Sequence, residues 1–236
     1  MSEKVIIGNC ELWHGDCREI LPTLPQSDLI LTDPPYGIGA SAGTGKYGRL
    51  KVEAGRDLAW DNETPPQWLM LLMLEKAAHL IVFGGNYFNL PPSRNYLVWD
   101  KGAGFKGRDF AECEFAWCSW DGNAKVLTRD PLANRDYEHK VHPTQKPVRV
   151  LEWAMSLAPK SDTVCDPFMG AASTAIAALN MGKRFVGVER ERQYFDAACR
   201  RIEQAYSQPR LFDDAKAIDN QFTQADFLIE ETNVTG

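Results

Sequence analysis

The stretch Leu29-Ile30-Leu31-Thr32-Asp33-Pro34-Pro35-Tyr36 joins an apolar run to an acid, two prolines and an aromatic ring. A short apolar run bounded by a turn signal indicates a buried β-strand. Two consecutive prolines neither extend a β-ladder nor begin an ordinary helical turn, so the chain leaves the sheet near Asp33. Open α/β sheets bind their ligands at the carboxyl ends of strands. The stretch therefore predicts an acid and a tyrosine at a ligand site. The alternative is a strand followed by a plain proline-rich turn.

A second strand-like run, residues 163–165, also ends at an acid, Asp166, and continues into Pro167-Phe168-Met169-Gly170. Residues 171–174 open a predicted helix that runs to about Met181, and the strand after it ends at Glu189. An acid about 20 residues after a glycine-containing turn is the layout of a site for a nucleotide-type cofactor. Neither Gly-x-Gly-x-x-Gly nor a P-loop is present. The pattern therefore predicts a cofactor with a ribose but no diphosphate, such as S-adenosylmethionine (AdoMet). Small residues that only let a helix pack on a strand are the alternative.

Strand and helix patterns alternate along the rest of the chain, which predicts one α/β domain with a large core. Further strands are predicted near residues 5–7, 11–13, 80–83, 96–99 and 114–118, and helices near 18–21, 66–74, 147–157 and 192–206. Beyond about residue 213 the chain is acidic and weakly apolar, so a loose tail is expected over 213–236.

Composition narrows the class of protein. The chain has 236 residues, 44% of them hydrophobic, and a net charge of −6, so only a local basic surface would bind nucleic acid. No apolar run reaches the ~20 residues of a membrane span, and no signal-peptide core follows Met1, so a cytoplasmic location is expected. The six cysteines include no Cys-x-x-Cys pair, which argues against a metal site or a disulfide framework.

Two glycine-rich stretches and one charged stretch carry the cations that could meet a phosphate backbone. The cations are Lys46, Arg49 and Lys51 in the first stretch, Lys106 and Arg108 in the second, and Arg129 and Arg135 within residues 121–141. A long aperiodic stretch that starts at a ligand site favours a functional loop, with a disordered insert as the alternative. Residues 121–141 are either a solvated loop or a compact element that reads nucleic acid.

The stretch His142-Pro143-Thr144-Gln145-Lys146-Pro147 precedes an apolar-faced helix. Pro147 suits the first helical turn, and Thr144 or Gln145 is the predicted cap. A lysine at a helix entrance can hold a carboxylate together with the free backbone N–H groups. A lone histidine here would more often be structural.

Taken together, these stretches resemble the AdoMet-dependent amino-group DNA methyltransferases, specifically their circularly permuted beta group. The family motifs are matched in order by Gly15-Asp16, 33–36, 142–147, 166–174 and Glu189. The resemblance therefore spans nearly the whole chain to about Phe212. One departure is Ala171-Ala172-Ser173, where the family has Ser-Gly-Thr, so the methyl of Ala172 could crowd the methionine part of AdoMet.

The resemblance implies a Rossmann-like fold, a single doubly wound, mostly parallel sheet with helices on both faces. It implies a methyltransferase domain over residues 1–212, with a catalytic half (about 1–120), a short target-recognition segment (121–141) and a cofactor half (142–206). The implied catalytic residues are Asp33, Pro34 and Tyr36. The implied cofactor residues are Asp16, Cys17, His142, Lys146, Asp166, Phe168, Gly170, Ser173 and Glu189. Double-stranded DNA is the implied partner, and a homodimer is possible.

These residues suit methyl transfer to an exocyclic amine. A carboxylate such as Asp33 and the Pro34 carbonyl can each accept one amine N–H, and Tyr36 offers a face to a base that has left the duplex. Asp at position 33 favours adenine N6 over cytosine N4 within the family. The alternatives are a cytosine-N4 enzyme, an RNA or protein-amide methyltransferase, and a catalytically inactive regulator that binds DNA or AdoMet.

Overall fold

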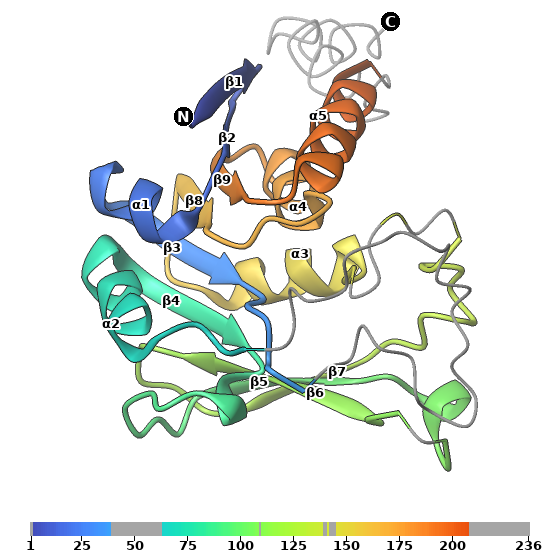
Figure 1. Ribbon diagram of the computed structural model, residues 1–236. Coiled ribbons are helices and arrows are strands. Elements are labelled where there is room, and N and C mark those ends of the chain that lie inside the picture. The colour runs from blue at the N-terminus through green and yellow to red at the C-terminus, as the bar shows by residue number, and fades with distance from the viewer. Residues whose placement is uncertain (1, 39–62, 109, 139–140, 142–144, 208–236) are drawn as a thin grey trace, which may run out of the picture.

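The computed structural model describes residues 2–38, 63–108, 110–138, 141 and 145–207 (Figure 1). These residues form one nine-stranded sheet in the order β1-β2-β9-β8-β3-β4-β6-β5-β7. The strands are β1 (Glu3–Ile7), β2 (Cys10–His14), β3 (Ser27–Thr32), β4 (Ala77–Phe83), β5 (Tyr96–Asp100), β6 (Cys113–Cys118), β7 (Lys125–Thr128), β8 (Thr163–Asp166) and β9 (Arg184–Glu189). The α-helices are α1 (Cys17–Ile20), α2 (Gln67–Lys76), α3 (Val148–Leu157), α4 (Ser173–Asn180) and α5 (Arg192–Ser207).

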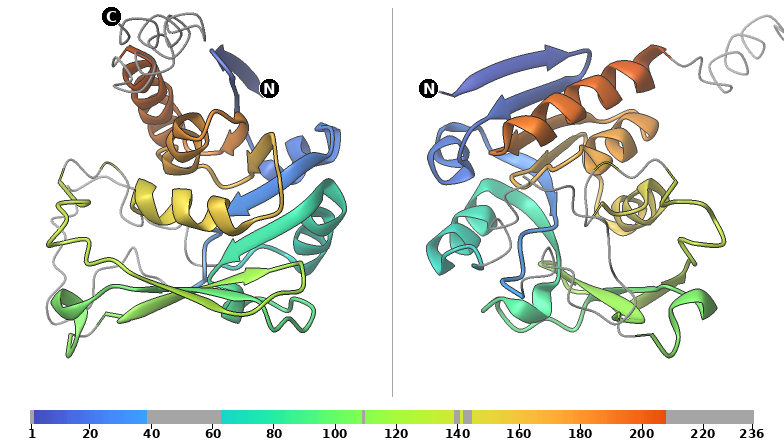
Figure 2. Two further views of the ribbon diagram at one scale, coloured as in Figure 1. Left: turned by 180° about the vertical axis from the view of Figure 1, so that it is seen from behind. Right: turned by 45° about the vertical axis from the view of Figure 1, so that its right-hand side comes forward.

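Among the described residues, five of the eight strand pairings are parallel, including all four that join β2, β9, β8, β3 and β4. Helices α1 and α2 cover one face of this sheet, and α3, α4 and α5 cover the other (Figures 1 and 2). The expected α/β class and single, mostly parallel sheet with helices on both faces are confirmed.

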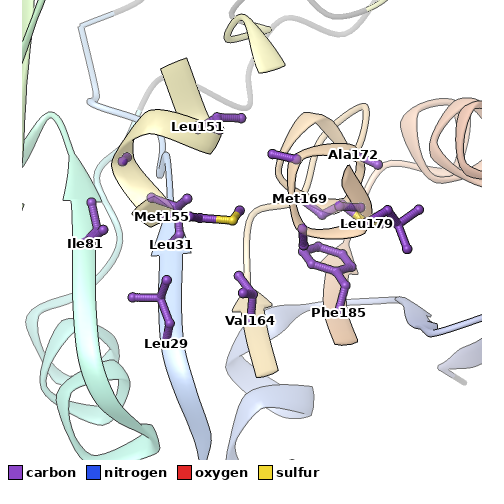
Figure 3. Close-up of a cluster of buried hydrophobic side chains, with 14 of the residues drawn as sticks. Leu29, Leu31, Ile81, Leu151, Met155, Val164, Met169, Ala172, Leu179 and Phe185 are labelled. Carbon is purple, nitrogen blue, oxygen red and sulfur yellow. The ribbon is translucent and has the colours of Figure 1, made fainter. Parts of the chain in front are cut away.

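Strand β3 shows why the sheet is buried on both sides. Leu29 and Leu31 point into the cluster under α3 and α4, which Figure 3 shows, while Ile30 points into the cluster under α1 and α2. All three side chains are fully buried. Successive side chains of a strand face opposite sides, so a strand covered on both faces needs a continuous apolar run.

The sheet brings the two acid-ended strands together. Strand β3 pairs in parallel with β8, with Leu29 opposite Val164 and Ile30 opposite Cys165. From β3 the chain continues to β4 on one side, and from β8 it continues to β9 on the other. The order of strands therefore reverses between β3 and β8, which is where open α/β sheets form a binding crevice.

Three local expectations need correction or qualification. Residues 121–141 were expected to be a solvated loop or a compact element that reads nucleic acid, but they contain strand β7, which pairs with β5. Helix α3 has Pro147 as its N-cap without a side-chain cap, and the side chain of Gln145 accepts from the Val141 N–H instead. Thr144 lies outside the described residues. Helix α4 begins at Ser173, two residues later than expected.

The expected domain limits remain predictions, and the expected tail 213–236 lies outside the described residues. In the part of the chain that is described, no helix combines the length and apolarity needed to cross a bilayer.

Candidate active site

A cavity of about 460 Å³ opens at the carboxyl ends of β2, β3, β8 and β9. Pockets for small ligands commonly have volumes of this order. Most of the predicted site residues line it, although they come from distant parts of the sequence: Asp16, Cys17, Asp33, Lys146, Asp166, Phe168, Gly170, Ser173 and Glu189. His142 lies outside the described residues.

Asp33 follows β3 directly and is held from two sides. The Tyr36 hydroxyl donates to one carboxylate oxygen (2.5 Å), and the Lys146 ammonium lies 2.5 Å from the other. Lys146 also lies 2.9 Å from a carboxylate oxygen of Glu114 on β6, and Lys101 lies 2.8 Å from the other oxygen of Glu114. The structure thus places Lys146, predicted beside the cofactor, in contact with the predicted catalytic acid.

Glu114 and Lys101 were not predicted as site residues. The signal for Glu114 was weak but present, since an acid stands at the start of the apolar run Phe115-Ala116-Trp117. Strand β6 pairs antiparallel with both β4 and β5, and Glu114, near its start, lies opposite Trp99 of β5.

Tyr36 is tightly packed. Its ring stacks on Tyr87 at a centroid distance of 4.8 Å, and Phe88 lies edge-on at 6.3 Å. A Cβ at Gly84 would lie 2.2 Å from the Tyr36 ring, and Gly84 has φ of +67°, so both space and backbone require glycine there. Tyr87, which is 45% exposed, is a second aromatic residue at the site that the sequence reasoning missed.

Asp166 joins the two halves of the sheet. Its carboxylate accepts from the hydroxyls of Thr32 and Thr174, both at 2.7 Å, and from the Phe168 N–H at 3.0 Å. Burial raises the pKa of Asp166 to about 6, against the lowering effect of these donors. The residue ties the end of β3 to the turn after β8 and to the start of α4.

Glu189 is the last residue of β9, and two backbone N–H groups hold its side chain. Its two carboxylate oxygens accept from the backbone N–H groups of Gly170 (2.9 Å) and Glu191 (2.7 Å). Burial raises the pKa of Glu189 to about 7, although both N–H groups favour the ionised form. Each oxygen retains lone-pair capacity for a further donor, such as a hydroxyl.

Asp16 is the N-cap of α1 and accepts from the Arg18 N–H at 2.9 Å and from the Arg18 guanidinium. These hydrogen bonds lower the pKa of Asp16, so the group is a carboxylate. The neighbouring Cys17 is buried, which raises the pKa of its thiol to about 12 and keeps it protonated.

The turn before α4 departs from expectation at Ala172. Its backbone is left-handed, with φ of +62°, yet its side chain is fully buried in the core cluster drawn in Figure 3 and does not line the cavity. The methyl of Ala172 therefore does not lie where it would crowd a ligand. Ser173 does line the cavity, and its hydroxyl is buried and has no hydrogen-bond partner within the described ranges.

The predicted DNA-contacting cations fall into three groups. Lys106 and Arg108 are exposed. Arg129 is bound bidentately to Asp136, at 2.7 and 2.8 Å, and Arg135 lies 3.6 Å from Glu138. Lys46, Arg49 and Lys51 lie outside the described residues.

Comparison with known proteins assigns the class. Residues 93–200 match the family N6_N4_Mtase, described as DNA methylase. The putative methylase YubD of Escherichia coli K12 is 30% identical over 217 residues, covering 80% of this chain and 88% of YubD. The chain therefore belongs to the N6_N4_Mtase family of DNA methylases.

Other relatives agree with this class. The type II methyltransferase M.HinfI of Haemophilus influenzae is 25% identical over 249 residues, covering 83% of this chain and 68% of that protein. The M1.HpyAVI–SAM complex superposes with a TM-score of 0.55 at 21% identity, covering 81% of this chain and 99% of M1.HpyAVI. The cytosine-N4-specific PvuII DNA methyltransferase gives 0.52 at 16% identity, covering 90% and 91%. At these identities the two structures show a shared fold.

Proposed function

We propose that this protein transfers a methyl group from AdoMet to the exocyclic N6 of an adenine that has left the DNA duplex. The observation that carries the proposal is the position of Asp33. Asp33 lines the same cavity as Glu189 and the turn 166–170, so a cofactor and an amine acceptor can meet there.

The residues of the cavity fit AdoMet. Glu189 has lone pairs for ribose hydroxyls, Phe168 supplies an apolar ring, and Asp16 is a carboxylate that can accept from an adenine amino group. Ser173, whose hydroxyl has no hydrogen-bond partner among the described residues, is the first residue of α4. Backbone N–H groups at a helix start favour a carboxylate, such as that of the methionine part of AdoMet. When bound, AdoMet supplies a methyl group already activated by its sulfonium.

The protein's own task is to prepare the amine. The lone pair of an exocyclic amine is delocalised into the base, which makes the nitrogen a poor nucleophile. A carboxylate at Asp33 and the carbonyl of Pro34 would each accept one N–H bond and draw the nitrogen towards tetrahedral geometry. The remaining contribution is to align the reacting atoms and exclude water.

The aromatic residues are the proposed platform for the base. A flipped base gains about 1–3 kcal/mol from stacking on an aromatic ring. Because Tyr87 already stacks on Tyr36, the pair Tyr36–Tyr87 rather than Tyr36 alone is the proposed contact surface. Exposed Lys106 and Arg108 are proposed to meet the phosphate backbone.

The proposal is tested with AdoMet labelled in its methyl group and unmethylated duplex DNA. The wild type should label DNA, and Asp33→Ala should lose transfer by roughly 10³-fold while AdoMet still binds. Structured RNA offered in the same reaction is the competitor. Label in RNA alone, or loss of AdoMet binding in Asp33→Ala, would overturn the assigned substrate or the assigned role of Asp33.

A further inference from the structure

Four charges of alternating sign, two of them buried and two partly buried, link Lys101 to Asp33. Lys101 lies 2.8 Å from Glu114, Glu114 lies 2.9 Å from Lys146, and Lys146 lies 2.5 Å from Asp33. Both lysines are 7% exposed. The four residues come from separate segments: after β5, on β6, before α3 and after β3. The charges sum to zero, which lowers the cost of burying them.

The order of the charges matters because Lys146 is shared. Glu114 and Asp33 both lie within ion-pair distance of its ammonium, so they compete for it. Lys101 gives Glu114 a cation of its own and leaves Lys146 available to Asp33. Lys101 is fixed in turn by the rings of Trp99 and Phe105, each with its centroid 5.4 Å from the ammonium.

We propose that Lys146, Glu114 and Lys101 are positioning residues that hold Asp33 ionised and in place for the target amine. The proposal rests on the proposed function, because it concerns the carboxylate assigned to the amine. It adds two residues, Glu114 and Lys101, that do not line the cavity themselves and are linked to Asp33 through Lys146.

The electrostatics of the cluster agree with this arrangement. Burial opposes ionisation of Glu114, but its two lysines prevail and lower its pKa to about 2. Burial raises the pKa of Asp33, Lys146 opposes that rise, and Glu114 adds to it. On acidification Asp33 is therefore protonated before Glu114. The other groups that face Asp33 are the Tyr36 hydroxyl and, from β8, Asp166.

The test is a series of three substitutions with opposite expected signs. Lys146→Met removes the cation from Asp33, and Lys101→Gln makes Glu114 draw on Lys146 alone. Both should raise the pH midpoint at which Asp33 is protonated. Glu114→Gln removes a repelling charge and leaves Lys146 to Asp33, so this midpoint should fall. For Lys146→Met, which removes a direct partner, the shift should be about one pH unit or more.

Two readouts report the midpoint. One is the acid limb of single-turnover methyl transfer at saturating AdoMet. The other is the carboxyl ¹³C shift of Asp33 in protein labelled at aspartate, assigned by its absence in Asp33→Ala. The second readout needs no catalysis, so it judges the inference even if the wild type methylates no DNA and the proposed function fails. Melting temperatures identify any variant that does not fold. If Lys146→Met does not fold, the isosteric variant Glu114→Gln still tests the proposal, because its pH midpoint for Asp33 protonation should fall.

Glu152→Gln is the matched control. Glu152 is a partly buried carboxylate on α3, paired with Arg149 at 2.8 Å, on the helix that follows Lys146. Its loss should leave the Asp33 midpoint unchanged. Three results would overturn the proposal: the Asp33 midpoint rises in Glu114→Gln, it stays constant through the series, or it moves equally in the control. Any of these would leave the four charges a purely structural cluster.

Discussion

Asp33 and Glu189 face the same cavity but are held in different ways. Glu189 accepts from two backbone N–H groups, one in its own turn and one 19 residues earlier in the turn after β8. Asp33 is held by an ammonium from a segment more than 100 residues later in the chain. Backbone donors are neutral and fixed, whereas Lys146 is a charge shared with a second acid. On the proposed cofactor side, backbone N–H groups therefore hold the acid, whereas on the proposed catalytic side a distant charge and the Tyr36 hydroxyl hold it.

Asp166 lies between the two sides, and its removal should have the largest effect on stability. Asp166→Ala leaves two buried hydroxyls and one N–H without their acceptor, so the free energy of unfolding should fall by about 2–4 kcal/mol. Urea denaturation measures this loss.

The matched control is Asp28→Ala. Asp28 also accepts three hydrogen bonds, from Asp162 and Thr163, but at the amino end of β3 and only half-buried. Water can replace the carboxylate as acceptor there, so the free energy of unfolding should fall by nearer 1 kcal/mol. Equal losses in the two variants would show that burial does not set the strength of the Asp166 contacts.

Glu189→Ala should weaken AdoMet binding by about 10–100-fold, because hydrogen bonds to a charged group are worth roughly 1.5–3 kcal/mol. The transfer rate at saturating AdoMet should change only a few-fold. Titration calorimetry and single-turnover kinetics separate the two effects. A large loss of rate with affinity intact would mean that the two sides of the site have been assigned the wrong way round.

The pH dependence of AdoMet affinity should follow Glu189. Its pKa is raised to about 7, and the ionised form accepts from ribose hydroxyls more strongly than the protonated form does. Binding should therefore be about tenfold weaker at pH 6 than at pH 8, because protonation competes with the ligand as pH falls. Glu189→Gln should flatten this dependence. An unchanged slope in that variant would assign the titration to another group.

Ala172→Gly should have the smallest effect. Glycine relieves a left-handed backbone that costs an alanine roughly 1 kcal/mol, but it removes a buried methyl worth about 0.8 kcal/mol. Stability should therefore change by less than about 1 kcal/mol, and AdoMet affinity should not change. Clearly tighter binding would restore the expectation from the sequence that this methyl crowds the cofactor.

The sequence predicted those features that depend on local pattern. The apolar runs that end at Asp33, Asp166 and Glu189 are strands, and the acids meet at one edge of the sheet as parallel strands require. The Glu114–Lys146–Asp33 cluster could not be predicted in this way. It depends on which strands become neighbours, and β6 enters the sheet antiparallel between β4 and β5.

The same limit applies to Ala172 and Tyr87. Whether the Ala172 methyl faces the core or the cavity depends on how α4 packs against β9, and not on the residues of the turn before α4. The stack of Tyr87 on Tyr36 depends on the approach of Gly84, 48 residues after Tyr36, to the Tyr36 ring.

The most direct test of the account is the identity of the methylated nucleoside. Purified protein, methyl-labelled AdoMet and unmethylated genomic DNA are incubated, and the DNA is digested to nucleosides and separated. The account predicts label in N6-methyladenine. Label only in N4-methylcytosine would contradict the choice of base, and no label in DNA with AdoMet bound would contradict the proposed reaction.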